Sequence, residues 1–247
     1  MTHLRQLMLD ELQRRNYSPS TVRCYIHAVE EFSKHFHRSP ERLGPSHIRE
    51  YQVHLFRDRK LSPGTIQSRC AALRFLFVKT LRRPYLLDEI PLPKRPRKLP
   101  AVLNPEEVAR LIDSARNLMH RTMLMTLYAT GLRRAELCHL KVTDIDSKRM
   151  VVRVEQGKGS KDRYVMLSPY LLTLLRQWWK ELEPEIWLFP SYQDRHMSGR
   201  QLHRICQETA KQAGIKKRVS PHTLRHNSEC RIIPRSRREF LIHIHHQ

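Results

Sequence analysis

The sequence lacks several features that would assign it to particular classes of protein. It has no apolar run of 18 residues and no basic-then-apolar signal peptide, so neither a membrane-spanning nor a secreted protein is indicated. Its five cysteines are scattered and form no CxxC pair, which argues against a zinc site or a disulfide framework. We therefore expect a cytoplasmic protein whose cysteines are small buried side chains in a reducing environment.

Negative charge is also scarce in this chain. Lys and Arg number 46 against 24 Asp and Glu, which gives a formal net charge of +22. The surplus is spread along the chain, because residues 1–90 hold 16 basic and 9 acidic residues and residues 101–226 hold 22 and 13. Such a surplus favours a polyanionic partner, with double-stranded DNA first and an anionic membrane second. The missing apolar run argues against the membrane.

A recurring local pattern predicts a mainly α protein. Five expected helix starts carry a capping Ser or Asn followed by a proline, and this pair favours the first turn of a helix. The five pairs are Ser18-Pro19, Ser62-Pro63, Asn104-Pro105, Ser168-Pro169 and Ser220-Pro221. The first two share the fuller pattern Ser-Pro-x-Thr. With amphipathic segments near residues 4–12 and 48–56, they predict a compact domain of about four helices over residues 1–90.

Residues 91–100 predict a boundary between two domains. The segment reads PLPKRPRKLP, and four prolines in ten residues forbid a helix and favour an extended strap. Its basic side chains are suited to contact a phosphate backbone, and they are Lys94, Arg95, Arg97 and Lys98. The alternative interpretation is an ordinary solvated linker.

A second domain is predicted over residues 101–226. Helices are expected near 105–116, 119–129, 169–182, 199–213 and from Pro221 onward. Two apolar runs, 150–154 and 163–167, flank a polar turn and predict a β-hairpin. The pattern fails after His226, so residues 227–247 are interpreted as an aberrant tail without assigned structure. The histidines near the end of this tail are not expected to bind a metal.

Three short motifs of the second domain could act together on a phosphate. In TGLRRAEL, Gly131 permits a tight turn, Arg133 is expected in the first helical turn, and Glu136 can steer its guanidinium. Lys158 lies on a turn between two glycines, where it could protonate a leaving oxygen. In His222-x-x-Arg225-His226, the first two side chains share a face at a helix start that favours anions. Each residue alone is more typical of a bland role: Arg133 of a surface or salt-bridge arginine, Lys158 of a solvated turn, and His222 of a helix cap.

Taken together, these motifs resemble the tyrosine recombinases, the phage-integrase and Xer-type site-specific DNA recombinases. The resemblance spans about residues 1–226, including ATGLRRAEL, GKGSKDRYVML, WLFPS and HTLRH. It implies a SAM-like core-binding helical domain that clamps duplex DNA, and a mixed α catalytic domain with a small antiparallel sheet, the DNA breaking-rejoining fold. It also implies that the protein self-associates on DNA and needs no cofactor.

The resemblance also implies roles for individual residues. Arg133 and Arg225 would hold the scissile phosphate, Lys158 would be the general acid, and His222 would be a phosphate-binding acid/base. Glu136 and His226 match the motif as supporting residues.

One departure from the family pattern is expected to matter for the reaction. The family's nucleophilic tyrosine follows HxxRH, whereas all eight tyrosines here precede His222. Because covalent catalysis needs a nucleophile, we expect a recombinase that is cleavage-deficient by itself. A frame change, a truncation or a diverged C-terminus could each explain the departure. The alternatives are a DNA-binding remnant, alone or complemented in trans by another subunit, and an unrelated basic helical protein that binds RNA. The low aromatic content, 7%, argues against the last.

Overall fold

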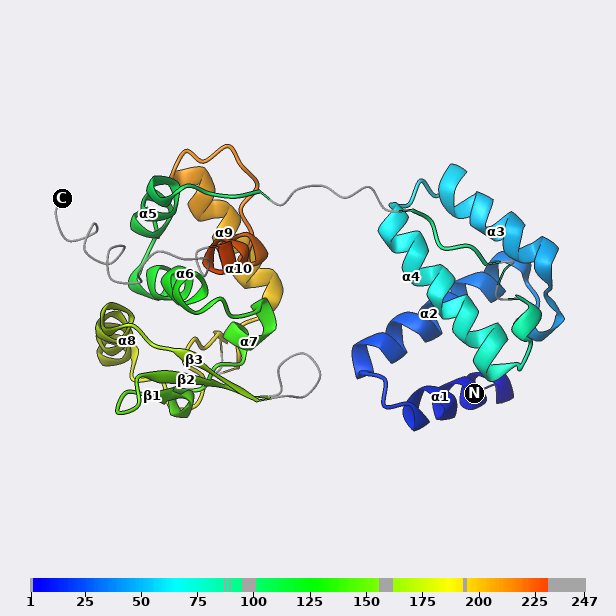
Figure 1. Cartoon of the computed structure of the whole chain (residues 1–247), viewed down its shortest axis with the longest axis horizontal. Helices are drawn as coiled ribbons and strands as arrows, with labels where there is room; N and C mark the ends of the chain where they lie inside the picture. The colour runs from blue at the N-terminus through cyan, green and yellow to red at the C-terminus, as the bar shows by residue number, and fades with distance from the viewer. Residues whose placement is uncertain are drawn as a thin grey trace. The chain divides into compact units, whose positions relative to one another are not determined.

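The computed structural model describes residues 2–86, 88, 90–94, 101–155, 162–192 and 195–230. The chain divides into two compact units, residues 1–98 and 99–247, each with its own hydrophobic core (Figure 1). Both units are mainly helical, and the second also contains a small antiparallel sheet. The predicted fold class is therefore confirmed.

The described part of the first unit is a bundle of four α-helices with short helical turns between and after them. The helices are α1 (His3–Arg14), α2 (Pro19–Phe36), α3 (Pro45–Arg57) and α4 (Pro63–Arg74), followed by a π-helical turn (Phe75–Thr80). The Oγ atoms of Ser18 and Ser62 accept hydrogen bonds from backbone N–H groups of α2 and α4, so both predicted helix starts are confirmed. α2 packs on α4, and Phe32 and Phe77 are fully buried in this core.

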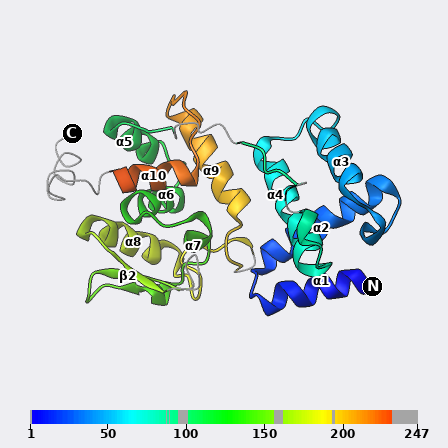
Figure 2. The same ribbon diagram turned by 45° about the vertical axis from the view of Figure 1, so that its right-hand side comes forward.

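The described part of the second unit contains six α-helices, and α6 packs against α5, α7, α8 and α10. Its helices are α5 (Pro105–Asp113), α6 (Leu118–Thr130), α7 (Arg134–Cys138), α8 (Pro169–Leu182), α9 (Gly199–Gln212) and α10 (Pro221–Cys230). Figure 2 shows α6 between α8 and α10, and α6 packs against both. Thr122, Thr126 and Thr130 are buried on α6, and each hydroxyl donates to the carbonyl four residues earlier. Residues 122–128 and Thr130 of α6 are all buried, so the helix gives the residues that follow it a fixed starting point.

The predicted hairpin is present within a three-stranded antiparallel sheet. β2 (Val151–Val154) pairs with β3 (Arg163–Met166), and Val154 lies opposite Arg163. A short strand, β1 (Ile145–Asp146), pairs with the other edge of β2 and was not predicted. Val152 and Val154 point into the core while Arg153 is exposed, as the two-residue period of a strand requires.

The last helix extends further than the sequence pattern indicated. The tail expected from Asn227 does not begin there, because residues 227–230 belong to α10. Asn227 is buried, and its Oδ1 accepts a hydrogen bond of 3.2 Å from the backbone N–H of Leu103. Lys217 also contacts the segment around Leu103. Its Nζ lies 3.1 Å from the carbonyl oxygen of Val102 and 2.7 Å from Glu107 Oε2. The remaining tail, with its histidines, lies outside the described residues.

Three of the cysteines whose side chains are described are buried, and one is exposed. Cys70, Cys138 and Cys206 are buried as expected, whereas Cys24 is exposed. Burial raises the pKa of the Cys206 thiol to about 12 and that of Cys138 to about 11. In the part of the chain that the structure describes, no helix combines the length and apolar character needed to span a membrane.

Candidate functional site

The site is built on the turn that joins α6 to α7. Gly131 ends α6 in a left-handed conformation with φ +63°, and its N–H donates to Leu127 O at 3.0 Å. Leu132 is buried, and Arg133 then precedes the first residue of α7. Arg133 is therefore the capping residue with an extended backbone, and the expectation that it lies inside the first helical turn is wrong. This position leaves the Arg133 side chain beside the helix start.

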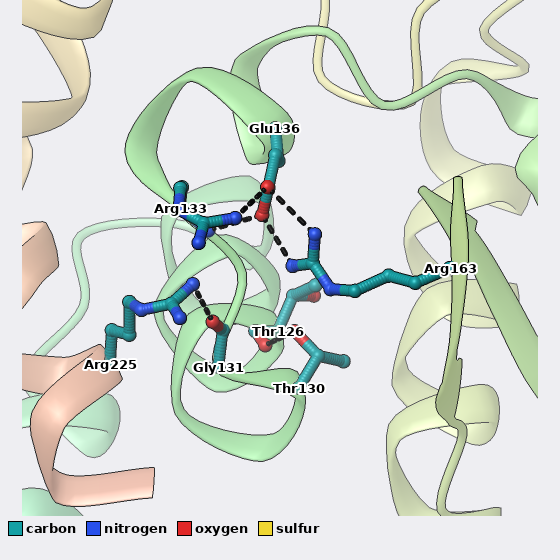
Figure 3. A network of polar contacts seen from close by, with 7 residues as sticks. All are labelled: Thr126, Thr130, Gly131, Arg133, Glu136, Arg163 and Arg225. Carbon is teal, nitrogen blue, oxygen red and sulfur yellow. Dashed lines mark hydrogen bonds and ion pairs between the residues drawn. The ribbon is translucent and has the colours of Figure 1, made fainter. Parts of the chain in front are cut away.

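Glu136 on α7 is the centre of an ionic cluster with two arginines (Figure 3). Its Oε2 accepts from the Arg133 backbone N–H at 2.7 Å, and its Oε1 accepts from Arg133 Nη1 at 2.8 Å. Arg163 donates through Nη1 to Oε1 at 2.8 Å and through Nη2 to Oε2 at 2.6 Å. The predicted contact between Glu136 and Arg133 is present, and the Arg163 contact is additional.

The electrostatics keep this carboxylate charged. The Glu136 side chain is only 7% exposed, and burial alone would raise its pKa. The hydrogen bonds from Arg163 and from the Arg133 N–H and guanidinium outweigh that effect and lower the Glu136 pKa to about 2. With one negative and two positive groups, the cluster carries a net positive charge.

Arg225 reaches the same turn from α10. Its Nη1 donates to the carbonyl oxygen of Gly131 at 2.8 Å, across 94 residues of sequence. Arg133 and Arg225 are thus both fixed at the turn formed by residues 131–133, as Figure 3 shows. Both side chains are partly exposed. A site with two such guanidinium groups can bind an anion with several oxygens, above all a phosphate.

The two histidines of the HTLRH motif are exposed on α10. The helix begins at Pro221 as predicted, and Ser220 Oγ accepts from the Thr223 N–H at 3.2 Å. His222 is the second residue of the helix and lies three residues before Arg225, so the two share a face. His226 is also exposed.

Several predicted site residues fall outside the described part of the chain. Lys158 is one of them, and so are Arg95, Arg97 and Lys98 of the linker. Lys94 is described and is exposed. Within the described ranges, no group of three or more His, Cys, Asp or Glu side chains is arranged to hold a metal ion.

Arg163 is a site residue that the sequence interpretation missed. The sequence pattern indicates only that Arg163 begins a strand, because no local signal connects it to a carboxylate 27 residues away. Two tyrosines near the motifs are largely exposed. Tyr164 on β3 is 64% exposed, and Tyr192 is 84% exposed.

Comparisons with known proteins place both units in known families. Residues 101–234 match the family described as Phage integrase family, and residues 4–86 match the Phage integrase, N-terminal SAM-like domain. A putative integrase/recombinase of Sinorhizobium fredii is 47% identical over 228 residues, which cover 92% of this chain and 74% of that protein. The tyrosine recombinase XerC of Anoxybacillus flavithermus is 29% identical over 97% of this chain and 88% of its own length.

A solved structure shows the same fold. The lambda integrase dimer (residues 75–356) bound to a COC′ core site aligns with a TM-score of 0.71, over 90% of this chain and 83% of that one. At 18% identity this likeness concerns the fold alone. The family matches exclude the alternative that the motifs are accidental in an unrelated basic protein. The chain belongs to the phage integrase family of tyrosine recombinases.

Proposed function

We propose that this chain is an integrase-type site-specific recombinase that binds double-stranded DNA, in which Arg133 and Arg225 hold the scissile phosphate. The observation that carries the proposal is that both arginines are fixed at one turn, from elements far apart in the sequence. Their guanidinium groups can donate to the non-bridging oxygens and stabilise the charge that develops during phosphoryl transfer.

The remaining motif residues complete this proposed site. His222 would act as a phosphate-binding acid/base near the start of α10, with His226 and Glu136 as supports. Lys158 would be the general acid, and it precedes Arg163 by five residues. Lys94, Arg95, Arg97 and Lys98 would contact the DNA backbone.

We also propose that these 247 residues do not cleave DNA by themselves. No tyrosine follows the HTLRH motif. Among the tyrosines of the second unit, Tyr128 is buried in α6, and Tyr164 and Tyr192 are exposed on the hairpin and a loop. Positioned arginines and acids accelerate attack only by a nucleophile that is present. This absence favours a second candidate function, a DNA-binding remnant that occupies recombination sites or joins a multimer in which another subunit supplies the tyrosine.

The DNA-binding part of the proposal is tested by affinity against salt. Each phosphate contact contributes a slope of about −0.9 to log affinity against log salt, so the chain should show a slope of several units. Alanine at Lys94, Arg95, Arg97 and Lys98 should flatten the slope for all sequences alike. Lys180→Ala is the matched control, because it removes an exposed cation from a segment with Glu181, Glu183 and Glu185. Binding no tighter than that of a neutral control protein would refute the proposal.

The cleavage part is tested with a suicide substrate. A binding site is selected from a random duplex library, nicked to trap a phosphotyrosyl adduct, and incubated with the chain. We expect no covalent adduct, and an adduct formed by the chain alone would contradict the proposal. Replacing residues 231–247 with a family segment that carries the tyrosine should restore cleavage, and Arg133→Ala or Arg225→Ala should abolish it again. A graft that binds the site without cleaving it would instead favour the DNA-binding remnant.

A further inference from the structure

Arg163 holds Glu136 in a geometry that a surface ion pair would not require. The guanidinium of Arg163 approaches as a fork, with Nη1 on one carboxylate oxygen and Nη2 on the other, at 2.8 and 2.6 Å. The Arg163 side chain is 34% exposed and the Glu136 side chain 7% exposed. A two-point contact fixes both the position and the plane of the carboxylate.

Each oxygen of that carboxylate also accepts from Arg133. Oε1 takes Arg133 Nη1 at 2.8 Å, and Oε2 takes the Arg133 backbone N–H at 2.7 Å. Figure 3 shows the carboxylate lying between the two guanidinium groups. Since Arg163 fixes the carboxylate, it also fixes where the Arg133 guanidinium can form its bond.

Arg163 changes the charge of the cluster as well as its shape. Glu136 with Arg133 alone would be a neutral pair, and the Arg133 guanidinium would be largely satisfied by its own carboxylate. The second arginine leaves one net positive charge, which remains available to an anion. The lowered pKa of Glu136, which follows from the bonds of both arginines, agrees with this arrangement.

We propose that Arg163 is a positioning residue for Arg133 and acts through the Glu136 carboxylate. In this role it couples the β2–β3 hairpin to the turn formed by residues 131–133. This rests on the proposed function, in which Arg133 binds the phosphate. Because Arg163 is the first residue of β3, the same contact ties the start of that strand to the phosphate-binding arginine. A lysine at position 163 would keep the charge but could not form the fork.

The first test observes Arg133 itself by nuclear magnetic resonance of protein labelled with ¹⁵N-arginine. Separate Nη–H signals appear for a guanidinium whose rotation is hindered, and those of Arg133 are identified by their loss in Arg133→Lys. We expect these signals to broaden in Arg163→Gln and in Arg163→Lys, while tryptophan fluorescence stays native. Arg149→Gln is the control, because Arg149 is a 77% exposed arginine of the same domain that pairs with Asp146. Unchanged Arg133 signals in both Arg163 variants would overturn the proposal.

The second test asks whether Arg163 acts through Glu136 or touches DNA directly. Affinity for a fluorescein-labelled random-sequence duplex is measured in a double-mutant cycle of Arg163→Gln and Glu136→Gln. We expect Arg163→Gln to weaken binding by about tenfold alone and to add little once Glu136 is replaced, since coupled residues are non-additive. A full additional loss in the Glu136→Gln background would mean that Arg163 contacts DNA itself, and the proposal would fail.

The two tests separate this inference from the proposed function. If the unmodified chain does not bind the duplex, the proposed function is refuted, while the Arg133 signals still report whether Arg163 positions that side chain. If the chain binds DNA and the signals do not respond to Arg163, only the positioning role is refuted.

Discussion

Two glutamates of this protein are each held by two arginines, and the two clusters differ in what they join. Glu11 on α1 pairs with Arg14 and Arg15, three and four residues later on the same segment. Glu136 pairs with Arg133 at its own helix start and with Arg163 on a strand 27 residues away. The hydrogen bonds lower the pKa of each glutamate to about 2. A lowered pKa therefore does not distinguish a local surface contact from one that connects two elements.

The two clusters differ in exposure at the carboxylate and at one arginine. Glu11 is 13% exposed and Glu136 7%, and Arg14 is 62% exposed, whereas Arg15, Arg133 and Arg163 lie between 34% and 36%. Exposed pairs on one helix gain little, because water screens them and two flexible side chains must be ordered. Removing one partner of a buried cluster leaves charges without compensation.

The largest effect is expected from Glu136→Ala. It would leave two partly buried arginines facing each other and should lower the unfolding free energy of the second unit by about 2–3 kcal/mol. Trp178, Trp179 and Trp187 all lie in the second unit, so tryptophan fluorescence during urea denaturation reports on it selectively. A midpoint equal to that of the unmodified chain would show that the cluster is not a stabilising connection.

Acid should weaken the same cluster without any mutation. The folded pKa of Glu136, about 2, lies below its ordinary value of 4.5. Its contribution is therefore complete above about pH 4.5 and is lost as the pH falls toward about 2. The urea midpoint of the second unit should fall more between about pH 6 and about pH 3 in the unmodified chain than in Glu136→Gln. Equal falls in both proteins would contradict the shift.

The turn that presents Arg133 should tolerate a side chain poorly. Gly131→Ala would place a Cβ at φ +63° and 3.2 Å from Ser228 Oγ, so we expect a loss of about 1–2 kcal/mol in the same denaturation assay. Gly214→Ala is the matched control, because Gly214 has φ +66° but no atom within 4 Å of the added Cβ. If Gly131→Ala lowers the unfolding free energy no more than Gly214→Ala does, the Ser228 side chain moves away from the added Cβ at little cost.

The smallest effect is expected from Glu11→Ala. Its partners lie within four residues, so only α1 loses a contact. Hydrogen exchange of peptides from residues 3–15, measured by mass spectrometry, should change slightly at low salt and not at all in concentrated NaCl, which screens exposed pairs. A change at Glu11 as large as that at Glu136, or one that persists in salt, would remove the distinction between the clusters.

Local chemistry made much of the fold predictable. The caps at Ser18, Ser62, Asn104, Ser168 and Ser220 all hold helix starts where the sequence placed them. A capping side chain contacts an N–H three residues away, so the signal and its partner lie in one short window. The hairpin was predictable for a similar reason, because strand residues alternate in burial along a few consecutive positions.

Contacts between distant residues were not predictable in the same way. The Arg163–Glu136 pair spans 27 residues, and the bond between Arg225 and the Gly131 carbonyl spans 94. The extension of α10 past His226 depends on Asn227 meeting Leu103, 124 residues earlier. Motif order pointed to Arg133 and Arg225 as partners, but only the packing of α6 against α10 brings them to one turn.

The bond between Asn227 and Leu103 has a mechanical consequence. The chain enters the second unit at residues 102–104, and there Asn227 and Lys217 hold it from α10 and from the loop before α10. A pulling force on the chain before Val102 would therefore act on α10, the helix that carries Arg225. The force would be transmitted by these side chains as well as by the backbone. The same force would reach the turn at residues 131–133, because Arg225 is bonded to Gly131.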